Sequence, residues 1–198
     1  MAPYIVHPWL IISIAAVVPL RVSAEQPKTS TPQKKTGPWK FMNTGVIYLN
    51  LTTMNTSGIL CKAAMRTALN ATARTFSQDI GIRYHDAWDY KRVDYTQIRR
   101  NNTPVKRFTS VNNETNEYTM YTFPYVLDEC AVIKKQTNTS REPKNVCELW
   151  VNYKFFERKP EEVHLCTKKF QNHCKVSNAT CYKIEDCHAS VSKLILIA

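Results

Sequence analysis

The sequence predicts an all-β fold with one C-terminal helix, in the form of an eight-stranded antiparallel barrel. Two observations favour this class. Apolar and polar residues alternate with a period of two in many short runs rich in β-branched and aromatic residues, and turn-forming residues separate the runs. One later stretch has the apolar spacing of a helix instead. A two-sheet sandwich is the alternative that these patterns leave open.

The chain begins with a predicted signal peptide, residues 1–24. Ile11 to Val18 is an apolar core that Pro19 ends, and Val22-Ser23-Ala24 has the small residues of a cleavage site. His7 stands where Lys or Arg is usual, which leaves a retained anchor as an alternative, but the apolar run is short for a membrane span. We therefore expect a secreted, extracellular protein.

A flexible N-terminal segment, residues 25–38, is expected next, because it is rich in Pro, Lys, Thr and Gln. The single domain then covers residues 39–198, a length that suffices for one core. Loss of the leader removes one Arg and no acid, so the formal net charge falls from +11 to +10. The mature protein is therefore strongly basic.

Eight runs with a period of two are predicted strands. They are Val46 to Leu51, Ile59 to Arg66, Arg74 to Tyr84, Val93 to Arg100, Val105 to Val111, Glu117 to Phe123, Cys130 to Lys135 and Cys147 to Tyr153. Asn-rich turns such as Asn101-Asn102-Thr103-Pro104 and Asn112-Asn113 separate them.

The predicted helix begins at Pro160, where proline and two acids suit a first turn. Val163, Cys166, Phe170 and Cys174 then fall on one helical face, which would pack on the barrel.

Seven Asn-x-Ser/Thr sequons indicate a glycoprotein and mark the solvent side of the fold. They begin at Asn50, Asn55, Asn70, Asn101, Asn113, Asn138 and Asn178. Several can be unused Asn-rich turns.

Seven cysteines in an exported chain predict a disulfide framework rather than a metal or redox site. We expect no metal, no cofactor and no enzymatic activity, because catalytic motifs such as Gly-x-Ser-x-Gly and His-Glu-x-x-His are absent from the sequence. Nucleic-acid binding is also disfavoured, since Lys and Arg are dispersed and the chain is exported.

Several motifs together resemble the tick salivary lipocalins, including the histamine-binding proteins. The motifs are Trp39-Lys40-Phe41, Tyr48-Leu49, Cys61, Cys130-Ala131-Val132, Glu148-Leu149-Trp150, Cys166 and the segment from Tyr182 to Cys187. The resemblance covers most of the mature chain. It implies a lipocalin barrel that sequesters a small host mediator to suppress inflammatory or immune responses, and we expect a monomer with no membrane span.

The resemblance also implies that Cys130 pairs with Cys166 and that Cys61 pairs with Cys187. Cys147 can reach Cys174 or Cys181. We favour Cys174, because it shares the helical face of Cys166.

An eight-stranded barrel can hold one small ligand, and the resemblance places Glu148 and Trp150 toward the interior. A carboxylate beside an indole ring suits a cationic amine. Further predicted ligand contacts are Trp39, Tyr48, Leu49 and Tyr121. If Asn50 points outward, the neighbours of opposite parity, Ile47, Leu49 and Leu51, point inward.

Ala131 departs from the family pattern, because amine-binding members carry Asp at this position. A buried cation without its carboxylate is costly, so one amine site is lost unless Asp94 or Glu117 substitutes. The basic net charge also favours anionic ligands. We therefore place a lipid, eicosanoid or sterol slightly ahead of histamine or serotonin.

A different class of function would use the outer surface to modulate a host immune protein or cell. The segment from His85 to Arg92 is the candidate contact, because it is aromatic and charged. The apolar C-terminal tail, Leu194-Ile195-Leu196-Ile197-Ala198, is expected to pack over the barrel.

Overall fold

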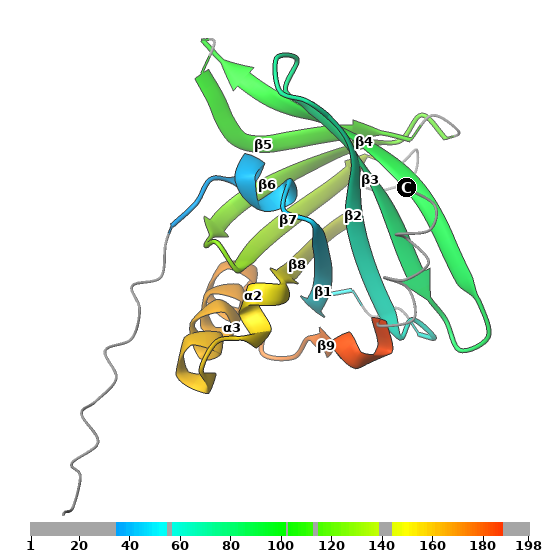
Figure 1. Ribbon diagram of the computed structural model, residues 1–198, viewed down its shortest axis with the longest axis vertical. Coiled ribbons are helices and arrows are strands. Elements are labelled where there is room, and N and C mark those ends of the chain that lie inside the picture. Colours follow the sequence, from blue (N-terminus) through cyan, green and yellow to red (C-terminus); the bar gives the residue numbers. More distant parts are fainter. Residues whose placement is uncertain (1–34, 55–56, 102, 113–114, 139–143, 188–198) are drawn as a thin grey trace, which may run out of the picture. The chain divides into compact units, whose positions relative to one another are not determined.

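Figure 1 shows the computed structural model of the chain, which describes residues 35–54, 57–101, 103–112, 115–138 and 144–187. The predicted signal peptide, most of the predicted flexible segment and the apolar C-terminal tail lie outside these residues. Those predictions stay predictions.

Eight long strands form an antiparallel sheet that closes on itself, since β2 pairs with both β3 and β1. The strands are β1 (Val46–Thr52), β2 (Cys61–Asn70), β3 (Thr75–Arg83), β4 (Trp88–Arg100), β5 (Thr103–Val111), β6 (Tyr118–Val126), β7 (Cys130–Asn138) and β8 (Lys144–Asn152). A short strand β9 (Thr180–Cys181) adds to the outer side of β1. The predicted all-β class and eight-stranded barrel are confirmed.

The predicted helix is present as α3 (Pro160–Cys174), which starts with Pro160 at its first turn and ends at Lys175 in the left-handed conformation. Three shorter elements were not predicted: α1 (Pro38–Met42), α2 (Tyr153–Phe156) and the 3₁₀ turn η1 (Ile184–Cys187). Strand β4 also starts at Trp88, so most of the segment considered as a surface loop belongs to a strand.

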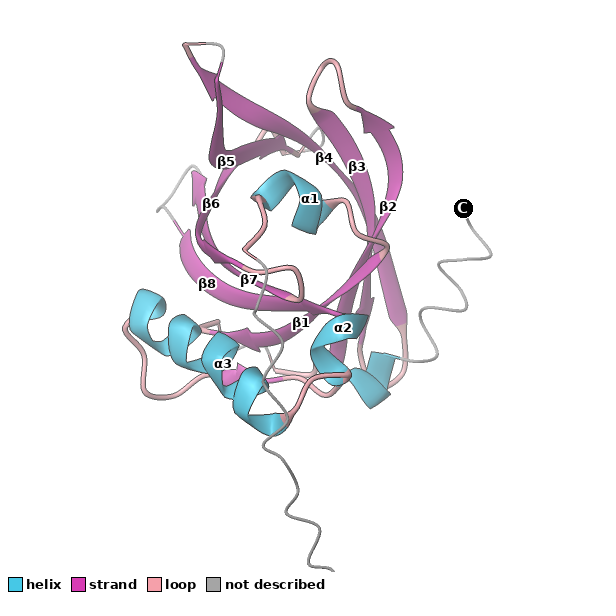
Figure 2. Cartoon of the chain, turned by 60° about the vertical axis from the view of Figure 1, so that its left-hand side comes forward, coloured by secondary structure: helices cyan, strands magenta, loops and turns pink. Residues whose placement is uncertain are grey.

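Helix α1 lies across one opening of the barrel (Figure 2). Phe41 is fully buried, and the side-chain amide of Gln78 donates a hydrogen bond of 2.8 Å to the Met42 carbonyl. The Trp39 ring contacts Phe76 and Phe108, with centroids 5.6 and 6.3 Å away. This end of the barrel is therefore closed by aromatic packing.

The period of two divides the apolar residues between two cores. Residues such as Phe76, Phe108 and Trp150 fill the barrel interior. Leu149 and Val151, which alternate with Trp150 on β8, point outward and pack with Phe170 of α3. One wall of the barrel is thus buried on both faces.

A β-bulge in β1 reverses the direction of its last residues. Leu49 lies opposite Trp150 and belongs to the interior, but Leu51 lies opposite Leu149 and packs in the outer core. The extra residue in the bulge moves all later side chains to the other face. The prediction that Leu51 points inward is therefore wrong, and the buried Thr52 takes the inward place opposite Glu148.

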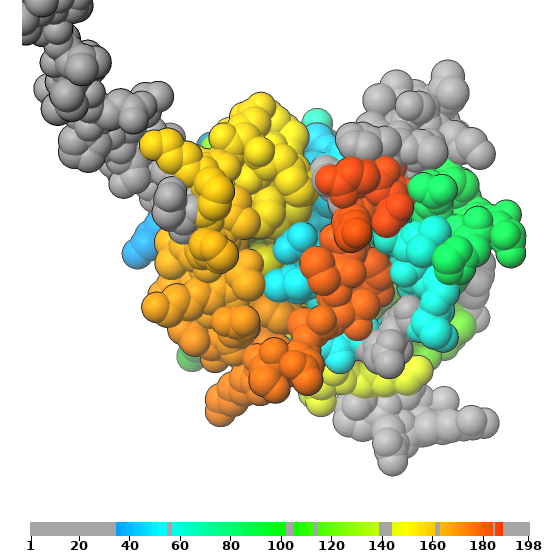
Figure 3. All heavy atoms as spheres, turned by 90° about the horizontal axis from the view of Figure 1, so that it is seen from below, coloured from blue at the N-terminus to red at the C-terminus, as the bar shows by residue number. Residues whose placement is uncertain are grey.

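Three disulfides tie peripheral elements to the barrel: Cys61–Cys187, Cys130–Cys166 and Cys147–Cys174. These are the pairs expected above, and Cys181 is a free, exposed thiol. Two bridges hold α3, and the third holds η1 against β2. Figure 3 shows β9 and η1, in orange and red, against the cyan surface of the early strands.

Four predicted glycosylation sites are exposed, namely Asn70, Asn101, Asn138 and Asn178. Asn50 is half-buried at the β1 bulge, and Asn55 and Asn113 lie outside the described residues. Use of the sequons stays a prediction.

Candidate functional site

A cluster of three charged side chains, a buried glutamate and two half-buried lysines, lies inside the barrel. Glu148 comes from β8, Lys135 from the neighbouring strand β7, and Lys62 from β2. Each is at an inward-facing strand position: Glu148 shares its face with Trp150, and Lys135 shares its face with Ile133. Glu148 is 4% exposed. The cluster therefore joins the consecutive strands β7 and β8 to β2, which is distant in the sequence.

Glu148 is the shared acceptor of the cluster. One carboxylate oxygen forms an ion pair with the Lys135 ammonium and accepts a hydrogen bond of 2.6 Å from the indole N–H of Trp150. The other oxygen lies 3.8 Å from the Lys62 ammonium. Within the described residues, these are the ion pairs that the two lysines make. Two ammonium groups thus face a single carboxylate.

Aromatic rings complete the surroundings of both lysines. The ammonium nitrogens of Lys135 and Lys62 lie 5.4 and 5.7 Å from the centroid of the Trp150 ring. Lys135 also lies 5.7 Å from the centroid of Tyr121. Ring faces attract cations, so these contacts offset part of the cost of burying two positive charges.

The pKa values in the cluster reflect burial and charge together. Burial alone would raise the pKa of Glu148, but the charges of Lys135 and Lys62 outweigh it and lower that pKa to about 2. Burial, together with the nearby charge of Lys135, lowers the pKa of Lys62 to about 8. At neutral pH Glu148 and Lys62 are therefore both charged.

A cavity of about 540 Å³ lies in the side of the barrel. It opens where β4 and β5 separate, because their ladder reaches only to Thr96 and Thr109 at this end. Tyr121 is part of its wall and hydrogen-bonds to Ser110 at 3.0 Å. The volume is in the usual range for small-molecule sites. Tyr121 is the residue of this wall that also contacts the cluster, because its ring centroid lies 5.7 Å from the Lys135 ammonium.

The structure brings together most of the predicted ligand contacts. Glu148, Trp150, Leu49 and Tyr121 belong to the barrel interior. Trp39 lies at the closed end, packed against that interior core. None of these placements tests a ligand contact, so the contacts stay predictions.

Tyr48 is placed elsewhere. It lies on the outer wall of the barrel, where its ring contacts Phe156 of α2 at 6.4 Å between centroids. It alternates with Ile47 and Leu49, which point inward. Tyr48 therefore does not line the interior.

Lys62 and Lys135 were missed by the sequence reasoning. A lysine in a strand usually faces solvent, and no single strand shows that two of them converge on one acid. A signal was present in β7, where Ala131 and Ile133 share the face of Lys135.

Neither of the two acids that were considered as substitutes at Ala131 lies beside it in the described part of the chain. Ala131 is fully buried in the interior core, opposite Trp150. Asp94 is exposed and accepts a hydrogen bond of 2.6 Å from Ser77. Glu117 precedes β6 and lies at the wall of the side cavity. At the Ala131 position the barrel interior carries a methyl group.

The described residues contain no group of three or more His, Cys, Asp or Glu side chains placed to hold a metal ion. The same part of the chain has no helix that is long and apolar enough to cross a membrane.

Comparison with known proteins shows similarity in the fold alone. No protein-family model matches the sequence, and no curated protein matches it. Among solved structures, the siderocalin Ex-FABP, which functions through dual ligand specificities, has 9% identity and a TM-score of 0.52 over 71% of this chain and 93% of its own. A complex of AM182 with serotonin has 16% identity and a TM-score of 0.51 over 76% of this chain and 94% of its own.

Japanin from Rhipicephalus appendiculatus, bound to cholesterol, has 12% identity and a TM-score of 0.46 over 66% of this chain and 87% of its own. The barrel is thus a lipocalin fold, as the first of these neighbours shows. The narrower resemblance to tick histamine-binding proteins has no support from sequence comparison.

Proposed function

We propose that this protein is a secreted lipocalin that sequesters a small amphipathic anion, a lipid carboxylate such as a fatty acid or an eicosanoid, in its barrel. The observation that carries the proposal is the excess of ammonium groups in the interior: Lys62 and Lys135 share the one carboxylate of Glu148. A ligand carboxylate would supply the second negative charge. Its hydrocarbon chain would pack against aromatic side chains beside the cluster, such as Tyr121 in the wall of the side cavity.

Amine binding is the weaker candidate in this barrel. The carboxylate that would receive a cation, Glu148, already pairs with two lysines, so an amine would have to displace an ammonium group. A third cation near Lys62 and Lys135 would also be repelled. The serotonin complex among the similar folds nevertheless makes serotonin a necessary comparison in any binding test.

The biological role follows the resemblance stated above. We propose that the ligand is a host mediator and that its removal dampens host inflammatory or immune responses at a feeding site. Three disulfides are consistent with an extracellular location. The surface alternative has less support, because in its candidate segment Trp88 and Tyr90 stack on each other within strand β4.

Calorimetric titration with a long-chain fatty acid and with its methyl ester tests the proposal. The two ligands share the apolar chain, but only the acid carries a charge. We expect the acid to bind at least about tenfold more tightly than the ester, histamine or serotonin. Equal affinities for acid and ester, or tighter binding of an amine, would overturn the proposal.

Lys135→Gln should remove the preference for the acid, because it removes one of the two cations. Lys134→Gln is the matched control: Lys134 is the exposed neighbour on the opposite face of β7, so its substitution should leave the preference unchanged. A thermal melt of each variant checks that the barrel is still folded.

A further inference from the structure

A second hollow lies at the end of the β4–β5 hairpin. It has a volume of about 520 Å³, and four of its seven lining side chains are exposed cations. The lining residues are Ile98, Arg99, Arg100, Val105, Lys106, Arg107 and Thr122. No acid is among them. This hollow is distinct from the side cavity, which is lined by the opposite ends of the same two strands and by residues of β6 and β7.

The hairpin itself brings the cations together. The β4–β5 ladder continues to the pair Arg100 and Thr103, so Arg99 and Arg100 lie beside the first residues of β5. A register shift between Gln97 and Arg99 bends β4 at this point. Cations from two strands therefore meet over one hollow.

Their positive charge is not neutralised within the described part of the chain. None of the four cations forms an ion pair there. Arg92, earlier on β4, is different, because it makes two hydrogen bonds of 2.8 and 3.1 Å to Asp79. The Arg99 guanidinium donates a hydrogen bond of 3.0 Å to the Thr72 carbonyl, which orients it and leaves other N–H groups for a ligand.

We propose that this hollow binds a linear sulfated polysaccharide. Three of the four cations are arginines, whose planar groups match the oxygens of a sulfate. The hollow is open and its cations are exposed, which suits a chain of anions better than an enclosed small anion. Its aliphatic residues, Ile98 and Val105, are only half-exposed, so they offer little surface for insertion into a lipid bilayer.

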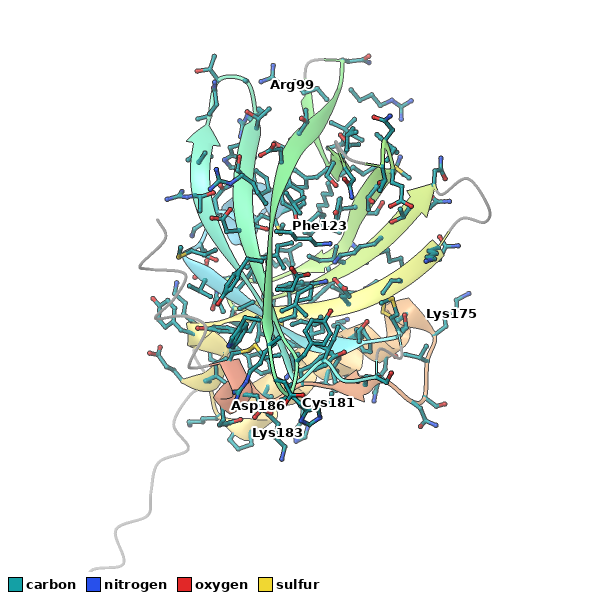
Figure 4. All side chains as sticks on the ribbon, turned by 90° about the vertical axis from the view of Figure 1, so that its right-hand side faces the viewer. Arg99, Phe123, Lys175, Cys181, Lys183 and Asp186 are labelled. Atoms are coloured by element: carbon teal, nitrogen blue, oxygen red, sulfur yellow. A yellow bond between two sulfur atoms is a disulfide. The ribbon has the colours of Figure 1, made fainter. Side chains whose placement is uncertain are left out.

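Such binding would leave the ligand cavity free. Figure 4 shows Arg99 at one end of the barrel, with Cys181, Lys183 and Asp186 at the other. Along β4, Arg100 is six residues from Asp94 of the side cavity, a span of about 20 Å at roughly 3.3 Å per residue. The protein could thus be retained on an extracellular polysaccharide while it binds a small molecule.

Titration with heparin at about 150 mM salt tests the proposal. We expect binding that weakens steeply as salt is added, and the double substitution Arg100→Gln with Arg107→Gln should weaken it roughly tenfold. The control is Lys175→Gln with Lys183→Gln, which removes the same charge from exposed positions far from the hairpin (Figure 4). The control should bind within about twofold of the wild type.

Equal losses in the two double variants would overturn the proposal, since net charge alone would then explain binding. Tighter binding to vesicles that contain phosphatidylserine than to heparin would also overturn it. Asn101→Gln is assayed beside the wild type, because a glycan at the hairpin tip would shield the hollow. If neither the wild type nor Asn101→Gln binds heparin, the proposed site is excluded.

Discussion

The role of Glu148 depends on the side chains that surround it. From the sequence it is a candidate receptor for a cationic amine. In the structure it is the counter-ion of two half-buried lysines and the acceptor for the indole N–H of Trp150. Its charge is therefore needed by the protein itself. Under the proposed function, a ligand that binds here complements the lysines, so we expect it to be an anion.

The substitution Glu148→Gln separates the two ligand classes by the sign of its effect. Glutamine keeps an oxygen for the Trp150 N–H but leaves Lys62 and Lys135 without their carboxylate. We expect the free protein to lose on the order of 3 kcal/mol of stability, as when one partner of a buried pair is removed. Affinity for a fatty acid should rise, because the ligand then supplies the missing charge.

Thermal melts and calorimetric titrations measure both effects. Glu157→Gln is the control, because Glu157 is exposed at the end of α2. An amine site at Glu148 requires the opposite outcome, namely that Glu148→Gln abolishes amine binding and gives no gain for the acid.

The directions of single side chains could be predicted from the sequence, but their partners on other strands could not. The inward direction of Trp150 and Leu49 follows from strand parity, and it was predicted. The partners of Glu148 were not predicted. Lys135 lies 13 residues earlier on the paired strand β7, whereas Lys62 lies 86 residues earlier on β2, and only barrel closure brings it near Glu148. Strand parity also predicts the wrong direction for the Leu51 side chain. The one-residue bulge that reverses it has no sequence signal as clear as the alternation of apolar and polar residues.

At the scale of elements, those with strong local sequence signals were predicted correctly, whereas the smallest elements were missed. Helix α3 was predicted from its proline start and its apolar face, both of which are local. Helix α1 has only five residues and is held by burial of Phe41 in the barrel opening. Short helices depend on such tertiary contacts more than on propensity. The same reason explains why α2 was missed.

The disulfides fix these peripheral elements, and their loop lengths predict a ranking of stability losses. Cys61 and Cys187 are 126 residues apart, whereas Cys147 and Cys174 are 27 apart. Chain entropy assigns about 5 kcal/mol to the longer loop and about 3.5 kcal/mol to the shorter one. Replacing both cysteines of each pair by alanine should therefore cost more for Cys61 and Cys187.

Urea unfolding of the two double variants measures this ranking. Each variant retains the other two bridges, so each serves as the control for the other. A larger loss on removal of the Cys147–Cys174 bridge would mean that packing of α3 on the barrel wall, through Phe170, outweighs chain entropy.

For the whole molecule, positive charge is concentrated at two separate places. The interior holds an excess cation beside Glu148, and the β4–β5 hairpin holds four exposed cations. Composition predicted the sign of the charge but not this division. The interior charge is buried and costs stability, whereas the hairpin charge is solvated. Of these two places, only the interior cluster should therefore affect strongly how the fold's stability depends on pH.

Global stability should change in two pH windows that the cluster sets. Because the pKa of Glu148 is lowered from 4.5 to about 2, its contribution is fully present above pH 4.5 and is lost as the pH falls toward 2. The pKa of Lys62 is lowered from 10.5 to about 8. Between these values the unfolded chain binds more protons than the folded one, so the Lys62 contribution to stability rises with pH.

Urea unfolding of the wild type and of two variants, each across one window, tests this linkage. The stability difference between wild type and Glu148→Gln should shrink as the pH falls from 4.5 to 2, since the wild-type carboxylate then also loses its charge. The difference between wild type and Lys62→Met should change between pH 8 and 10.5, because methionine has no proton to lose. Parallel curves in both windows would mean that the ion cluster does not form in solution, and the case for an anionic ligand would lose its structural basis.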